Sequence, residues 1–94
     1  DGFVVASDLP RGVDEKKITI MAMAMLTLAQ ETMDELGTSD LERVLVESKD
    51  SYTVLLNVNA DAVLATVATK DAVLGLLLLA MAQAVQEIEK ILVA

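Results

Sequence analysis

The longest amphipathic segment of the chain is residues 18–36, in which apolar residues recur at the three- and four-residue spacing of an α-helix. One broad apolar arc has the width expected of a helix that packs on a core. Its members are Ile18, Met21, Ala22, Met25, Leu26, Leu28, Ala29, Met33 and Leu36. A second, shorter stripe lies on the opposite side and consists of Ile20, Met23, Ala24 and Thr27. We therefore predict a helix with two apolar faces, which needs two packing partners.

Residues 73–92 repeat this design in a second predicted helix. Its core arc consists of Leu74, Leu77, Leu78, Met81, Ala84, Val85, Ile88, Ile91 and Leu92. A separate apolar stripe of Leu76, Leu79 and Ala80 lies on the far side, and this side becomes polar toward the C-terminus. The second helix is therefore also predicted to need a second packing partner.

Four segments have strand character, namely residues 2–7, 41–48, 52–58 and 62–69. Short polar breaks at 49–51 and 59–61 separate the last three segments, which predicts an antiparallel meander. Residues 52–58 are almost continuously apolar, so this strand is predicted to be central and covered on both faces. Asp14 and Gly37 are the predicted N-cap and C-terminal stop of the first helix. The sequence thus predicts an α+β domain of order β-α-β-β-β-α, with helices on both faces of one antiparallel sheet.

The dipeptide Asp1-Gly2, directly before the first predicted strand, is common in tight hairpin turns. The strand that should precede such a turn is missing from the sequence. We therefore expect residues 1–94 to form a single domain that either is truncated at its N-terminus or receives the missing elements from another chain.

Composition narrows the classes of partner. Hydrophobic residues make up 54% of the 94 residues, a high load for one small domain, which suggests burial against another chain. The net charge of −8 opposes binding to nucleic acid and to anionic membrane surfaces. The most apolar run, residues 72–82, is too short to span a bilayer, so no direct membrane insertion is expected. The absence of cysteine favours a cytoplasmic location.

No group of residues in the sequence indicates a chemical reaction. Pairs of acidic residues occur on polar helical faces, where solvated charge is expected. These pairs are Asp14 with Glu15, Asp34 with Glu35, and Glu87 with Glu89. Because the chain has neither histidine nor cysteine, the usual ligands of soft metals are absent. We predict that the chain is not an enzyme and that it has no cofactor or metal site.

Several segments, in their order and spacing over nearly the whole chain, resemble the Roadblock / dynein light chain family of small α/β domains, which have a profilin-like fold. The matching segments are residues 1–7 (DGFVVAS), the Ala/Met/Leu helix ending at 35–37 (ELG), 41–47 (LERVLVE), 62–65 (AVLA) and 71–77 (DAVLGLL). Members of the family typically carry a further helix and strand before the point where this chain begins. In the family that helix packs beside the last helix. Its absence would leave Leu76, Leu79 and Ala80 as a surface open to solvent.

The resemblance implies a homodimer, or a pair with a related Roadblock-like subunit, in which edge strands pair and the two long middle helices lie side by side. On this analogy the helix 18–36 brings its second stripe to the dimer or to another protein, and residues 41–48 form the edge strand. The implied interface residues are Ile20, Met23, Ala24, Thr27, Glu42, Arg43, Val44 and Val46. Two simpler interpretations remain open: the helix could be buried all round inside one domain, and the strand charges could only resist aggregation.

Members of the family act as platforms or regulators for Ras-like small GTPases, or as adaptors in motor and membrane-tethering complexes. The resemblance therefore implies a non-catalytic dimeric scaffold or regulator of a Ras-like small GTPase. One alternative is a purely structural adaptor subunit of a larger complex. Another is a small-molecule sensor whose ligand lies against the sheet.

Overall fold

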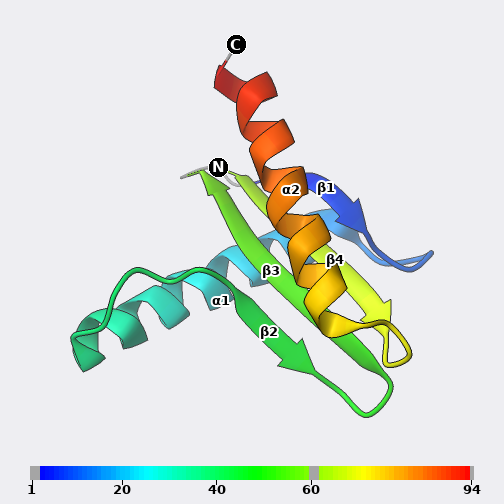
Figure 1. Ribbon diagram of the computed structural model, residues 1–94, viewed down its shortest axis with the longest axis horizontal. Helices are drawn as coiled ribbons and strands as arrows, with labels where there is room; N and C mark the ends of the chain where they lie inside the picture. Colours follow the sequence, from blue (N-terminus) through cyan, green and yellow to red (C-terminus); the bar gives the residue numbers. More distant parts are fainter. Residues whose placement is uncertain (1–2, 60–61, 94) are drawn as a thin grey trace.

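The computed structural model describes residues 3–59 and 62–93 and contains the predicted order of elements (Figure 1). The elements are β1 (Phe3–Asp8), α1 (Glu15–Leu36), β2 (Val44–Glu47), β3 (Ser51–Asn59), β4 (Ala62–Thr69) and α2 (Leu74–Val93). The α+β class and the order β-α-β-β-β-α are thus confirmed. The strand predicted at 41–48 is shorter than expected, because Glu42 and Arg43 precede β2.

The four strands form one sheet in the order β1-β4-β3-β2. β2, β3 and β4 make the predicted antiparallel meander, and β3 has a strand on each side, as its continuous apolar sequence predicted. β1 pairs with β4 in parallel, so the prediction of a wholly antiparallel sheet was wrong at this edge. Parallel neighbours need a long crossover connection, which α1 and the first two strands of the meander provide here. The predicted Asp1-Gly2 turn lies outside the described residues.

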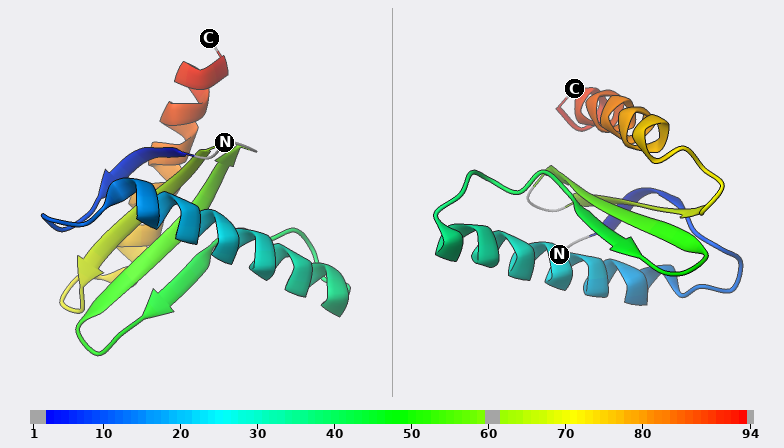
Figure 2. Two further views of the ribbon diagram at one scale, coloured as in Figure 1. Left: turned by 180° about the vertical axis from the view of Figure 1, so that it is seen from behind. Right: turned by 60° about the horizontal axis from the view of Figure 1, so that its bottom comes forward.

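The two helices cover opposite faces of the sheet, α1 on one and α2 on the other (Figure 2). Val54 and Leu55 are neighbours in β3, and both are almost fully buried, because successive side chains of a strand point to opposite faces. The buried cluster on the α2 side consists of Val54, Val58, Ala62, Leu64, Met81 and Ile88. The buried cluster on the α1 side consists of Ala22, Leu26, Leu55, Val63 and Ala65. β3 is therefore the shared wall of two cores.

Both ends of α1 are capped as the sequence predicted. The Asp14 carboxylate accepts a hydrogen bond from the Lys17 backbone N–H at 3.1 Å. At the other end Gly37 has φ +71°, and its N–H donates to the Asp34 carbonyl at 3.1 Å. The Thr38 N–H donates to the Met33 carbonyl at 3.0 Å, which completes a Schellman-type stop.

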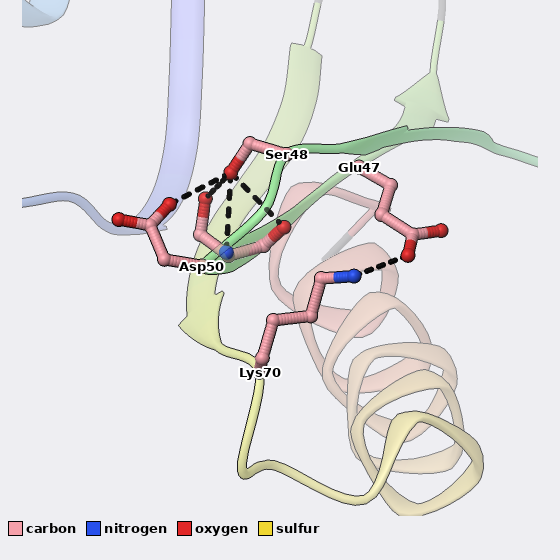
Figure 3. Close-up of polar contacts among 5 residues, drawn as sticks. Glu47, Ser48, Asp50 and Lys70 are labelled. Atoms are coloured by element: carbon pink, nitrogen blue, oxygen red, sulfur yellow. Dashed lines mark hydrogen bonds and ion pairs between the residues drawn. The ribbon is translucent and has the colours of Figure 1, made fainter.

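A polar cluster ties the β2–β3 turn to the loop that leads into α2 (Figure 3). In the turn, the Ser48 hydroxyl donates to the Asp50 carboxylate at 2.9 Å. The Lys70 backbone N–H donates to the Asp50 carbonyl at 3.1 Å, and the Lys70 ammonium pairs with Glu47. The same ammonium lies 4.7 Å from the centre of the Tyr52 ring. Because each of these charges contacts a residue of the same fold, we interpret the cluster as structural.

The left-handed conformation at the end of α1 gives a test of this description. Gly37→Ala should lower the free energy of unfolding by about 1 kcal/mol, because an L side chain at positive φ is strained even though no atom lies within 4 Å of the added Cβ. Gly75→Ala is the matched control: this glycine is inside α2 with equally open space, so the change should raise stability by up to about 0.5 kcal/mol. Urea unfolding followed by circular dichroism measures both, and equal effects of the two changes would contradict the assignment.

Candidate interaction surface

The face of α1 that packs on the sheet is centred on Thr19, Ala22 and Leu26, all of which are buried. The predicted core arc was therefore wrong for four residues that the structure leaves exposed: Met21, Met25, Leu28 and Leu36. The cause is Thr19, whose hydroxyl donates to the Glu15 carbonyl at 2.8 Å within the helix. Because this hydrogen bond satisfies the hydroxyl group, Thr19 can be buried like a small apolar residue. Relative to the predicted orientation, α1 is therefore rotated so that Thr19 faces the sheet.

The second predicted stripe of α1 divides between solvent and core. Ile20, Ala24 and Thr27 are exposed. Met23 is half-buried and packs against the cluster on the α1 side, together with Leu41 and Val44. Met23 therefore contributes to the fold.

An apolar row on α1 is exposed to solvent, and we call it the outer row. It consists of Ile20, Met21, Ala24 and Leu28, which follow the helical spacing and are all exposed. Leu28, at 64% exposure, lies almost directly opposite Leu26 around the helix, at 3%. The helix thus has two apolar faces, as predicted, but the outward face is composed differently from the predicted stripe.

The free edge of β2 lies on the same side of the molecule as the second half of α1. β2 pairs only with β3 among the described strands, so its other edge carries backbone groups without a strand partner there. Val44 and Val46 stand opposite Leu55 and Thr53, which places both valines on the α1 face of the sheet. Val44 is half-buried and Val46 is exposed.

Charged residues near this edge are mostly outside the strand. Glu42 and Arg43 form an ion pair with each other at 3.4 Å, in the segment that precedes β2. Glu47, inside the strand, pairs with Lys70 of its own chain. The described edge thus carries one charged side chain, which leaves its backbone open to a second strand.

The outward stripe of α2 is exposed where the sequence placed it. Leu76 and Leu79 are 64% and 56% exposed, and Ala80 is exposed beside them. Ile91, predicted to lie in the core, is exposed. Figure 1 shows the reason, because the C-terminal part of α2 extends past the end of the sheet. The Leu92 side chain lies outside the described residues.

A cavity of about 250 Å³ lies between the first half of α1 and the sheet. Its wall is almost entirely apolar, and Thr53 is the one polar residue in it. The other lining residues are Leu9, Pro10, Val13, Ile18, Met21, Ala22, Met25, Leu55, Ala65 and Val67.

One member of each acidic pair has a local structural role. Asp14 caps α1, Asp34 accepts a hydrogen bond from the Gln30 side chain at 2.9 Å, and Glu87 pairs with Lys90 at 3.3 Å. In the part of the chain that the structure describes, no three acidic side chains gather closely enough to hold a metal ion. Neither described helix is long and apolar enough to cross a membrane.

The accessible surface of the chain is unusually large. It measures 6455 Å² for 10.0 kDa. A compact monomer of this mass exposes only about 5,200 Å². The difference of roughly 1,200 Å² is larger than the share of about 800 Å² that one protein buries in a standard interface. The exposed rows on α1 and α2 account for part of it.

Comparison with known proteins identifies the family to which this chain belongs. The sequence pattern of the Roadblock/LC7 domain matches residues 1–68, from β1 through most of β4. Three uncharacterized proteins of Methanocaldococcus jannaschii are similar over 89 residues, or 95% of this chain. One is 32% identical with 75% of its own length covered, and the other two are 30% identical with 77% covered. The chain belongs to the Roadblock/LC7 domain family.

Proposed function

We propose that this chain is a non-catalytic scaffold or regulator that forms a dimer through α1 and the free edge of β2, and that the dimer binds a Ras-like small GTPase in the cytoplasm. Membership of the Roadblock/LC7 family supports a role in protein–protein interaction. Two observations carry the dimer: the outer row of α1 is apolar and exposed, and β2 has one edge without a strand partner among the described residues. The second copy is this chain or a related Roadblock-like subunit.

The exposed apolar surface of the outer row sets how much of the free energy of dimerisation the row can supply. Half to two-thirds of the surface is exposed in each of Ile20, Met21 and Leu28. Burying one of these side chains therefore stabilises a dimer by roughly 1–2 kcal/mol of free energy. Two copies together would gain roughly 6–12 kcal/mol, against an association cost of about 4–15 kcal/mol. The row alone thus supports a marginal dimer. Backbone pairing along β2, with Val44 and Val46 on the α1 face, would supply further contacts.

The outer row can be tested with one matched pair of substitutions. Leu28→Glu should weaken dimerisation by about two orders of magnitude or more, because each copy then carries a charge into an apolar contact. Leu76→Glu is the control, since Leu76 is equally exposed at 64% but lies on the other layer. Sedimentation equilibrium measures both dissociation constants. A wild-type chain that stays monomeric, or a dimer that Leu28→Glu leaves intact, would overturn this interface.

The proposed partner can be tested with a Ras-like GTPase encoded in the same genome. We expect the wild-type chain to bind it and to change its single-turnover rate of GTP hydrolysis, and Leu28→Glu to lose this effect along with the dimer. Binding without any change in rate would favour the adaptor alternative. Absence of binding to every such GTPase would contradict the proposed partner.

One observation favours a second candidate function, a sensor of small apolar molecules. The cavity under α1 has about 250 Å³ and an apolar wall, and a protein cavity of about 150 Å³ is large enough to bind benzene. A ligand there would lie against β3 and β4, next to Met21 and Met25. Since both methionines are flexible and lie on the proposed dimer helix, occupancy would affect the same interface.

Thermal unfolding with octanoate tests the sensor. Binding to the folded chain should raise the melting temperature in proportion to the logarithm of ligand concentration above the dissociation constant. Val67→Phe, which fills part of the cavity, should remove the shift, and Val46→Phe, outside the cavity, should retain it. No shift, or the same shift in all three proteins, would rule this function out.

A further inference from the structure

A larger cavity, which we call the polar hollow, lies between the second half of α1 and the end of β3. Its volume of about 450 Å³ is within the range of small-ligand sites. Polar side chains are more numerous here than in the apolar cavity under the first half of α1. The lining residues are Met23, Leu26, Thr27, Gln30, Glu31, Asn57 and Asn59. No lysine or arginine is among these lining residues.

The strand wall of the polar hollow begins where the core on the α1 side ends. Leu55 is almost fully buried in that core, whereas Asn57 and Asn59 farther along β3 are exposed. Val58, between the two asparagines, packs in the cluster on the α2 side. Beyond Leu55, no residue of β2 is paired with β3 in the described part of the chain. The amide groups therefore line a part of β3 that β2 does not extend to.

The helix wall adds a carboxylate and an apolar surface. Met23, Thr27 and Glu31 follow one another at four-residue spacing, so they lie in one line along α1. Glu31 is exposed and forms no ion pair with another described residue. Met23 is half-buried and Leu26 is buried, so the deepest part of the hollow is apolar.

Gln30 is fixed in place between these walls. Its side-chain oxygen accepts a hydrogen bond from the Leu41 N–H at 3.0 Å. Its side-chain nitrogen donates to the Asp34 carboxylate at 2.9 Å. Because both ends of this amide are bonded, part of the wall is ordered before any ligand binds, which lowers the entropy cost of binding.

We propose that the polar hollow binds a guanidinium group carried on a short aliphatic stem. The stem packs on Met23 and Leu26, and the head donates hydrogen bonds to the Glu31 carboxylate and the Asn57 side-chain oxygen. A guanidinium is planar and has five N–H donors, so it can reach acceptors on both walls at once. The net charge of −8 favours a cationic ligand. This site lies outside the outer row and does not depend on the proposed dimer.

N-butylguanidinium is the simplest probe of the site. Titration into the ¹⁵N-labelled chain, followed by NMR, should give saturable shifts at Glu31 and Asn57, with a dissociation constant in roughly the millimolar range. Pentylammonium has an aliphatic stem and the same charge but no planar head, so it should bind about tenfold more weakly. Equal binding of the two cations, or shifts that do not saturate, would overturn the guanidinium site.

One matched pair of substitutions tests the carboxylate. Glu31→Gln should weaken binding of N-butylguanidinium by about three- to tenfold, because the charge-assisted hydrogen bond is lost at an exposed position. Glu35→Gln removes the same charge one turn farther along α1, outside the polar hollow, and should change the dissociation constant by less than about twofold. An equal loss in both variants would mean that only net charge matters, and the site would be refuted.

A third variant separates binding from folding. Asn57→Val should weaken binding by about threefold or more, because the side-chain oxygen is removed. It should leave the free energy of unfolding unchanged or raise it, since valine has the higher strand propensity. Wild-type affinity in this variant would remove the strand wall from the proposal.

Two further probes identify the source of the guanidinium. Agmatine represents a free metabolite, and the peptide acetyl-Ala-Arg-Ala-amide represents an arginine side chain of a partner protein. Tighter binding of agmatine assigns the polar hollow to a small metabolite, and tighter binding of the peptide assigns it to a partner. If neither these probes nor N-butylguanidinium binds saturably, the proposal is wrong, while the dimer is tested separately by Leu28→Glu.

Discussion

A four-stranded sheet can cover only one face of each helix, and both helices of this chain are apolar on two faces. β3 satisfies the inner faces of both, since Val54 packs toward α2 and Leu55 toward α1. The outer faces have no partner within the described chain. Their exposure is consistent with an accessible surface well above that of a compact protein of 10.0 kDa. The functional question for this fold is thus which molecule covers each outer face.

Local rules of sequence predicted much of the fold. The caps of α1 at Asp14 and Gly37, the polar breaks of the meander and the central position of β3 all depend on residues close together in the chain. The parallel pairing of β1 with β4 was missed because it depends on a crossover through α1, which no local pattern encodes.

The candidate surface was predicted less completely. Apolar periodicity showed that α1 has two faces, but it could not say which face the sheet takes. Burial of Thr19, with its hydroxyl satisfied inside the helix, rotates α1 so that Met23 joins the core and Leu28 faces outward. Ile91 was misassigned because a helical pattern does not reveal where the supporting sheet ends.

The most direct test of the central claim is disulfide trapping of a dimer through the outer row of α1. The chain contains no cysteine, so Ala24→Cys introduces a single thiol in the middle of the row. The account predicts that mild oxidation joins two copies of this variant, and that Leu76→Cys on α2 is joined far more slowly. Equal cross-linking of the two variants, or an Ala24→Cys chain that remains monomeric, would contradict it.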